Sequence, residues 1–244
     1  MSGSRVLRHL LRAGIFHPRL MWLRGDEPRH RTRRRPSATE SHILEPAQCA
    51  LLVLDCQPEA LGSVVNSRAV VFRTNSAIDT VRRLGGYVGF TRLAFQDSDY
   101  LFTPSTNQEF ADLARERRLR NGTSDADLHP GLAVSANDIV VRKTRLGAFS
   151  TTNLDERLTN LGVTTLILAG VHASGAVLST VREAADKDYR LIVLADCISD
   201  ADTATQQLLV ERVFPQQAEV LTTTKLERML ASQGLAGEMR THVG

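Results

Sequence analysis

The sequence predicts an α/β fold in which a six-stranded, mainly parallel sheet lies between two layers of helices, a three-layer α/β/α arrangement. Two observations lead to this prediction. Short apolar runs with few alternating polar positions recur along the chain, as in strands that are buried on both faces. Segments with helical periodicity separate these runs, as in chains that cross over between parallel strands. With 244 residues, of which 42% are apolar, the chain is long enough for one domain of this kind.

The expected strands are short apolar runs that begin at about residue 50. The first of them, Ala-Leu-Leu-Val-Leu, is continuous and ends directly before Asp55. In chain order the expected strands are 50–54, 87–93, 139–141, 165–169, 190–195 and 218–221. Because each is followed by a helical segment before the next begins, parallel pairing is the expected arrangement.

The expected helices have apolar residues at helical spacing, and several stop at glycine, which favours the left-handed conformation that ends a helix. Gly85-Gly86 follows the first helix, Asn121-Gly122 the second and Gly162 the third. In chain order the expected helices are 66–84, 107–120, 151–161, 174–187, 202–213 and 225–231. The connections over 94–107 and 121–138 are too long for plain turns, so we expect them to lie over the functional site.

The first 36 residues differ from the rest in composition. They hold ten Arg and two acids and carry a net charge of +8, whereas the other 208 residues carry −5. Such a segment is typical of a mitochondrial presequence and equally of a helix on an anionic membrane surface. A dispensable extension, or a true start at Met21, explains it as well. We therefore expect a cytoplasmic protein, or one of the mitochondrial matrix if residues 1–36 are a presequence.

The expected division of the chain is a basic extension and linker at 1–46, one domain at 47–235 and a tail at 236–244. The acidic balance of the domain speaks against nucleic acid as a partner, because phosphate contacts need a basic face. Residues 163–181 carry no charge and have the length of a membrane span, but their glycines, hydroxyl residues and central His fit a buried strand, a turn and a helix start better. The three cysteines are odd in number and form no C-x-x-C pair, so buried free thiols are expected.

Chemically active residue types follow several of the expected strands. Asp55 follows the first strand, Lys143 the third and Asp196 the fifth, while the segment 170–176 follows the fourth. Ligands of open parallel sheets bind beyond these carboxyl ends. A charged group there is costly unless it is capped or paired, and Asp55 and Lys143 in one crevice would set each other's protonation. A purely structural capping role for Asp55 is the alternative.

The order of these residues resembles the isochorismatase-like hydrolase superfamily. The resemblance covers about residues 48–226 and rests on Leu-Val-Leu-Asp55-Cys-Gln57, Val-Val-Arg-Lys143-Thr-Arg145-Leu-Gly-Ala148-Phe149, Leu-Ala-Gly170-Val171 with Thr180 on the next helix, and Leu-Ala-Asp196. The K-x-R-x-x-A-F element is its most specific part. The resemblance implies a Rossmann-like three-layer fold, a hydrolase without cofactor, Asp55 as catalytic acid/base with Lys143 as its partner, and a homo-oligomer.

One departure from the family pattern matters for the chemistry. In the amidohydrolase branch a nucleophilic Cys opens the helix after the fourth strand, and Ala176 occupies that position here. Ala cannot form a thioester, so a covalent mechanism is not expected. Isochorismatase itself resembles this chain in having a small residue there: its Asp protonates a vinyl ether and water captures the oxocarbenium ion. Cys56, which should point to the other side of its strand, and Ser174, a natural helix N-cap, are weak substitutes.

Metal-bearing nicotinamidases have an Asp-x-His…His cluster after the second strand. The corresponding segment here, 95–100, has no His, so no metal is expected. Substrate contacts are expected from Gln57, Arg145, Phe149, His172, Ser174 and Gly175. A structural role is the alternative for His172, and a salt bridge for Arg145.

Together these features predict an isochorismatase-like hydrolase of a small organic substrate that uses Asp55 for proton transfer and forms no covalent Cys intermediate. The alternative is a catalytically silent protein of the same fold that binds a small ligand or a protein partner.

Overall fold

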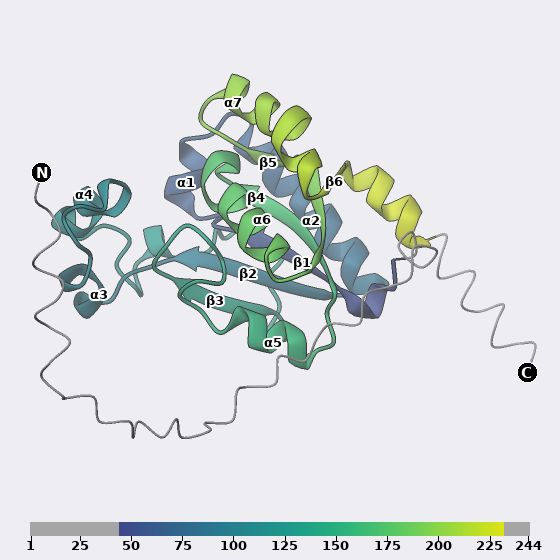
Figure 1. Ribbon diagram of the computed structural model, residues 1–244, viewed down its shortest axis with the longest axis horizontal. Coiled ribbons are helices and arrows are strands. Elements are labelled where there is room, and N and C mark those ends of the chain that lie inside the picture. The colour runs from purple at the N-terminus through teal and green to yellow at the C-terminus, as the bar shows by residue number, and fades with distance from the viewer. Residues whose placement is uncertain (1–43, 232–244) are drawn as a thin grey trace, which may run out of the picture. The chain divides into compact units, whose positions relative to one another are not determined.

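The computed structural model describes residues 44–231, so the predictions for the basic segment 1–36 and for the tail at 236–244 lie outside the described residues. The described part is built on one sheet (Figure 1). Its strands are β1 Cys49–Leu54, β2 Tyr87–Leu93, β3 Ile139–Lys143, β4 Thr165–Val171, β5 Arg190–Ser199 and β6 Glu219–Leu221. The strand order is β3-β2-β1-β4-β5-β6, and every neighbouring pair is parallel. The predicted six-stranded parallel sheet is confirmed.

Helices cover both faces of this sheet. In chain order the helices are α1 Pro58–Gly62, α2 Ser67–Arg83, α3 Asp97–Leu101, α4 Gln108–Glu116, α5 Leu154–Asn160, α6 Leu178–Ala185 and α7 Thr203–Leu208, with a further helix over 223–231. Of these, α3 and α4 lie beyond the edge of the sheet (Figure 1). Helical turns of 3-10 or π type are η1 Pro46–Gln48, η2 Ser124–Ala126, η3 Ala173–Val177, η4 Leu209–Val213 and η5 Phe214–Gln216. The helices predicted at 174–187 and 202–213 therefore each contain a turn of π-helix, η3 and η4.

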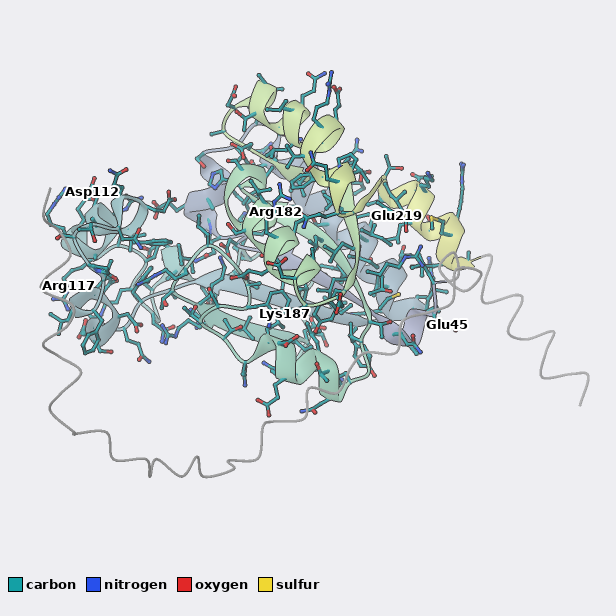
Figure 2. The ribbon with its side chains drawn as sticks, in the orientation of Figure 1. Glu45, Asp112, Arg117, Arg182, Lys187 and Glu219 are labelled. Atoms are coloured by element: carbon teal, nitrogen blue, oxygen red, sulfur yellow. The ribbon has the colours of Figure 1, made fainter. Side chains whose placement is uncertain are left out.

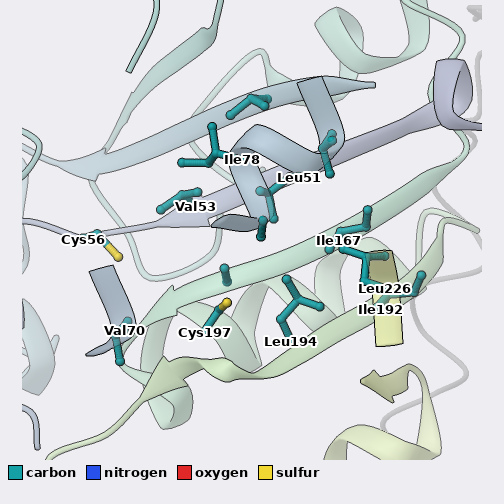
Figure 3. Packing of buried hydrophobic residues seen from close by; sticks show 14 of the residues in the cluster. Leu51, Val53, Cys56, Val70, Ile78, Ile167, Ile192, Leu194, Cys197 and Leu226 are labelled. Atoms are coloured by element: carbon teal, nitrogen blue, oxygen red, sulfur yellow. The ribbon is translucent and has the colours of Figure 1, made fainter. Parts of the chain in front are cut away.

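The central strand β1 shows why the fold needs two helical layers. All six of its residues are buried, and successive side chains of a strand point to opposite faces. Leu51 and Val53 join a core with Ile78 of α2 and Leu226 of the last helix (Figure 3). Ala50, Leu52 and Leu54 join a second core, on the other face, with side chains from α5 and α6. The three-layer α/β/α arrangement follows from this division.

The connection between β2 and β3 holds a predicted helix and one that was not predicted: α4 lies within the helix expected at 107–120, whereas α3 lies in the segment 94–107 that was expected to be a loop. Both helices lie beyond the carboxyl ends of β2 and β3 (Figure 1). They have a small core of their own, in which the rings of Tyr100 and Phe110 lie 5.4 and 6.1 Å from the ring of Phe95. Among residues 44–231, no helix is long and apolar enough to cross a membrane.

The expected strand end at Asp196 is wrong, because β5 continues to Ser199. The pairing of β4 with β5 is irregular at this point: Leu168 lies opposite Val193, but Gly170 lies opposite Ile198. The Asp196 carboxylate is used structurally. It accepts hydrogen bonds from the backbone N–H and the hydroxyl of Thr223, at the start of the last helix, and pairs with Arg73 at 3.2 Å.

The chain reverses its direction of strand addition between β1 and β4, and this switch point is where open α/β sheets bind ligands. Gly170 lies there, opposite Leu54, with φ +125°. A Cβ on Gly170 would lie 2.0 Å from the carbonyl oxygen of Leu54. Glycine at this position therefore allows the backbones of β1 and β4 to approach each other beside Asp55.

Gly170→Ala should lower the free energy of unfolding by several kcal/mol, because the new Cβ meets backbone atoms and the φ angle disfavours any side chain. The measurement is chemical denaturation of the full chain. Gly62→Ala is the matched control: nothing lies within 4 Å of its Cβ position and its φ is ordinary, so it should be neutral or slightly stabilising. Equal denaturation midpoints for the wild type and Gly170→Ala would contradict this account of β1–β4 packing.

Candidate active site

Asp55 turns the chain out of the sheet at the end of β1. Its φ is +51°, a left-handed conformation that Asp tolerates better than most residues. Its side chain is 9% exposed. Its backbone N–H donates to the carbonyl oxygen of Thr91 on β2, at 3.2 Å, so the next strand holds the turn in place.

Both carboxylate oxygens of Asp55 have partners. Oδ2 lies 2.6 Å from Nζ of Lys143, and Oδ1 accepts a hydrogen bond of 2.7 Å from the hydroxyl of Thr91. Lys143 belongs to β3, and β2 separates it from β1. Two strand spacings amount to about 10 Å, so a long side chain is needed to reach across β2. The predicted meeting of Asp55 and Lys143 is thus present in the structure.

The ammonium group of Lys143 is completely buried, and each of its three N–H donors has an acceptor. Besides Asp55, these acceptors are the carbonyl oxygens of Leu146 at 2.6 Å and Arg145 at 3.1 Å. A buried charge is tolerated only with such partners. All three N–H groups of Lys143 are therefore engaged within the protein, one of them by Asp55.

The loop that supplies those two carbonyl groups is fastened to α6. The backbone N–H of Ala148 donates to the Thr180 hydroxyl at 3.2 Å, and that of Phe149 donates to Glu183 Oε2 at 2.9 Å. Gly147 lets the loop come this close, since a Cβ there would lie 2.2 Å from the Glu183 carboxylate. The K-x-R-x-x-A-F element therefore has a physical reason: it builds the acceptor cage of Lys143.

The segment after β4 forms the opposite side of the switch point. The peptide bond between Val171 and His172 is cis, and η3 begins directly after it. Ala176, within η3, is 2% exposed. The pairing of Leu54 with Gly170 brings this segment alongside Asp55.

The sequence suggested that Ser174 caps the helix, but in the structure it does not. The N-cap position of η3 is His172, and Ser174 lies within the turn. Its backbone N–H and its hydroxyl both donate to Asp200 Oδ2, at 2.7 Å each. Asp200 follows β5 and is 6% exposed, so it fixes η3 against the end of that strand.

His172 is hydrogen bonded to Ser63, which ends α1. Nε2 lies 2.7 Å from the Ser63 hydroxyl oxygen, and that hydroxyl is 2.8 Å from the carbonyl oxygen of Ala60. The single hydroxyl proton is best placed toward Ala60, which assigns the proton of the other bond to Nε2 and leaves Nδ1 as an acceptor. This contact fits the structural alternative for His172.

Two residues with expected substrate contacts, Gln57 and Phe149, are engaged by other parts of the protein. The side-chain amide of Gln57 makes two hydrogen bonds with the backbone of Leu93. Its oxygen accepts from the Leu93 N–H at 2.8 Å, and its NH₂ group donates to the Leu93 carbonyl oxygen at 3.0 Å. The ring of Phe149 lies in a core, 5.9 Å from the ring of Tyr189, which directly precedes β5 and thus belongs to the opposite end of the sheet. These positions speak against direct substrate contacts for Gln57 and Phe149.

Arg145 remains near the site. Its guanidinium lies over the ring of Phe110 in α4, 5.4 Å from the centroid, and donates to the carbonyl oxygen of Thr144. No ion pair with a carboxylate is recorded for it among residues 44–231. Lys187, labelled in Figure 2, makes a cation–π contact with a different ring: its ammonium nitrogen lies 5.7 Å from the centroid of Phe149.

The three cysteines are poor nucleophiles. All are buried, and Cys56 and Cys197 both belong to the core on the α2 face (Figure 3). Burial raises the pKa of Cys49 to about 11, and burial together with the Asp55 charge raises the pKa of Cys56 to about 12. Burial and the neighbouring Asp196 likewise raise the pKa of Cys197. The thiolate is the reactive form, so at neutral pH these groups are inert.

Metal ligands do not gather anywhere in the described part of the chain. Within residues 44–231, no three His, Cys, Asp or Glu side chains are grouped so that they could hold a metal ion. The site is thus made of one carboxylate, one buried ammonium group and a turn of helix, at the carboxyl edge of a parallel sheet.

This fold and site can be compared with known proteins. The family model described as the isochorismatase domain matches residues 49–225. The chain belongs to the isochorismatase family. Among the curated members is the uncharacterized isochorismatase family protein YwoC of Bacillus subtilis, 28% identical over 174 residues, with 71% of this chain and 89% of that protein covered.

Relatives with named activities and solved structures also match. The ureidoacrylate amidohydrolase RutB of Methylobacterium radiotolerans is 30% identical over 191 residues, covering 68% of this chain and 72% of that protein. An isochorismatase family protein from Burkholderia thailandensis has a TM-score of 0.68 at 27% identity, covering 78% of this chain and 98% of that one. The N-carbamoylsarcosine amidase from Thermoplasma acidophilum has the same fold, with a TM-score of 0.57 at 24% identity. The match covers 72% of this chain and 96% of that one. These names favour a hydrolase.

Several residues of the site were not found from the sequence. Thr91 is a polar residue within an otherwise buried part of β2, which is the signal that could have found it. Asp200 and Glu183 act on backbone groups that lie 26 and 34 residues away in the chain, so no local pattern marks them.

The inertness of the thiols is directly testable. In native full-length protein at pH 7.5, a chromogenic disulfide reagent should find no rapidly reacting thiol, because all three are buried and protonated. In denaturant the same reagent should find three. A single thiol that reacts within the first minute and maps to Cys56 would contradict this prediction and restore a cysteine nucleophile.

Proposed function

We propose that this protein is an isochorismatase-family hydrolase of a small organic substrate, in which Asp55 transfers the proton and no covalent enzyme intermediate forms. The observation that carries the proposal is the buried pair of Asp55 and Lys143 at the carboxyl edge of the sheet. The segment that contains Ala176 follows β4, whose Gly170 pairs with Leu54, the residue before Asp55. The proton-transfer group of the family pattern is present, and its nucleophile is replaced by a methyl group. Family membership favours the hydrolase class, while the mechanism is inferred from the residues of this chain.

The surroundings of Asp55 support a role in proton transfer. Its side chain is the partly exposed member of the pair, at 9%, whereas that of Lys143 is fully buried. A substrate can therefore meet the carboxylate and not the ammonium group. Each carboxylate oxygen has one partner in the protein and a further lone pair for a substrate or water. Lys143 stabilises the ionised form each time the proton has left.

A reaction without a nucleophile is consistent with this arrangement. With a vinyl ether, protonated Asp55 would deliver its proton to the terminal vinyl carbon, leaving an oxocarbenium ion. Water would add to that ion and lose a proton, and the resulting hemiketal would break down to a ketone and an alcohol. The proton released from water restores the acid form of the Asp55 carboxyl group, so no other group has to change its charge.

Arg145 supports a substrate with a carboxylate group. Arg145 comes two residues after Lys143 in the sequence. Its guanidinium makes a cation–π contact with the ring of Phe110. An Arg without a carboxylate partner in the described residues is suited to bidentate binding of a substrate carboxylate. The imidazole of His172 is a second polar group, at the start of η3 after β4. We propose that these two groups orient the substrate and that Ser174 and Gly175 line its path through the exposed part of η3.

The proposal predicts the effect of Asp55→Asn. This change keeps the shape of the side chain and removes proton transfer, so turnover should fall by about 10²–10⁴-fold. The measurement is hydrolysis of isochorismate, ureidoacrylate and N-carbamoylsarcosine by the full chain. Lys225→Gln, a change outside the proposed site, is the control and should retain activity. Unchanged turnover of a hydrolysed substrate by Asp55→Asn would contradict the proposal.

Ala176 and the three inert thiols also favour a second candidate, a catalytically silent protein that binds a small carboxylate ligand. Absence of hydrolysis across the same three compounds, together with saturable binding of one of them, would support this candidate. Ala176→Cys separates the two accounts further. If the remaining geometry is that of the amidohydrolases, this variant should gain amidase activity on ureidoacrylate or N-carbamoylsarcosine and form an acyl-enzyme visible by mass spectrometry.

A further inference from the structure

We infer that Thr91 is the positioning residue of Asp55: its hydroxyl fixes the carboxylate in the orientation that directs Oδ2 to the ammonium group of Lys143. The inference rests on the proposed function in so far as Asp55 is the catalytic residue. It goes beyond it by assigning the orientation of that residue to a side chain on a different strand.

Thr91 lies in the interior of β2, between the strands that carry the ion pair. Its pairing partners are Leu54 on one side and Val141 on the other, so it stands one residue before Asp55 in register and two before Lys143. It is completely buried. Sterically, a Val would suit this position as well as a Thr, because both are β-branched and of nearly equal size.

The hydroxyl group is therefore the feature that needs a reason. A buried hydroxyl without a partner costs free energy, and this one has a single proton to donate. That proton is placed on Asp55 Oδ1, at an oxygen–oxygen distance of 2.7 Å. The backbone N–H of Asp55 donates to both oxygens of Thr91, with N···O distances of 3.3 Å to the hydroxyl and 3.2 Å to the carbonyl oxygen.

Thr91 thus contacts both the backbone and the carboxylate of Asp55. The two side-chain contacts of that carboxylate divide its oxygens: one for the hydroxyl, the other for Lys143. Without the hydroxyl, Oδ1 would be left as an acceptor at the edge of an apolar strand. Rotation of the carboxylate toward Lys143 or toward solvent would relieve it, and Oδ2 would leave the position that the ion pair requires.

The test compares three variants of the full chain. Thr91→Val removes the hydroxyl and keeps the shape, Thr91→Ser keeps the hydroxyl, and Thr165→Val removes a buried hydroxyl at the amino end of β4, far along the strand from the site. Thr91→Ala is a second hydroxyl-free variant in case Thr91→Val does not fold. Crystal structures of these variants report the Asp55–Lys143 geometry without any turnover.

We expect the 2.6 Å contact between Oδ2 and Nζ to be lost in Thr91→Val and retained in Thr91→Ser and Thr165→Val. With isochorismate as the substrate, Thr91→Val should lower kcat about tenfold at a nearly unchanged KM, because the interaction concerns proton transfer and not binding. Thr91→Ser should restore kcat to within a few-fold of the wild type.

An unmoved carboxylate in both hydroxyl-free variants would overturn the inference, and so would the same displacement in Thr91→Ser. These outcomes are separate from failure of the proposed function. If the wild type hydrolyses none of the three compounds, the proposed function fails, while the crystal structures still decide whether Thr91 orients Asp55.

Discussion

The buried ion pair between Asp55 and Lys143 is the interaction on which the rest of the site depends. An ammonium group with no exposed surface needs an acceptor for each of its three protons, and Asp55 supplies one of them. The other two come from the loop after β3, which is anchored on Thr180 and Glu183 of α6. The charge of one lysine thus explains the local sequence from residue 143 to residue 149.

The same pair constrains the neighbouring strands. Asp55 leaves β1 in a left-handed conformation, held by the backbone of Thr91, while β4 approaches closely through Gly170. The parallel order places these groups at one edge of the sheet, at the point where the direction of strand addition reverses. The same few residues therefore determine both the strand packing and the geometry of the site, so a substitution at one of them affects the others.

The chemistry of the site is defined as much by Ala176 as by the ion pair. η3 follows β4 and contains Ala176, the position at which the proposed function sets a methyl group in place of a thiol. The three thiols that this chain does have are buried away from that position, with pKa values raised by burial. These features support the proposed route, in which water attacks directly and Asp55 transfers the proton.

The sequence was sufficient to predict the sheet, because each strand is a run of apolar residues and each crossover has helical periodicity. It also placed Asp55 and Lys143 together, since the carboxyl ends of parallel strands share one edge. It failed where long-range contacts decide. Asp196 looked like a strand end, but an irregularity opposite Gly170 lets β5 continue to Ser199. Ser174 looked like a cap, but Asp200, distant in the chain, binds its hydroxyl.

Gln57 and Phe149 illustrate the same limit for the site. Their places in the motifs suggested substrate contacts. In the structure, the Gln57 side chain is hydrogen bonded to the backbone of β2, and the Phe149 ring stacks on an aromatic ring that precedes β5. Composition and spacing show which residue types lie near an edge. They do not show which of those side chains are already engaged by the protein.

The most direct test of the account is a double-mutant cycle on the free energy of unfolding, with Asp55→Asn, Lys143→Met and the double variant. Breaking a buried ion pair from one side leaves an uncompensated charge, whereas removing both charges relieves it. We predict that each single change destabilises the protein by about 3 kcal/mol or more and that the double variant is less destabilised than the sum by about 2–3 kcal/mol. Single effects that add to within about 0.5 kcal/mol would contradict the claim that this ion pair organises the site.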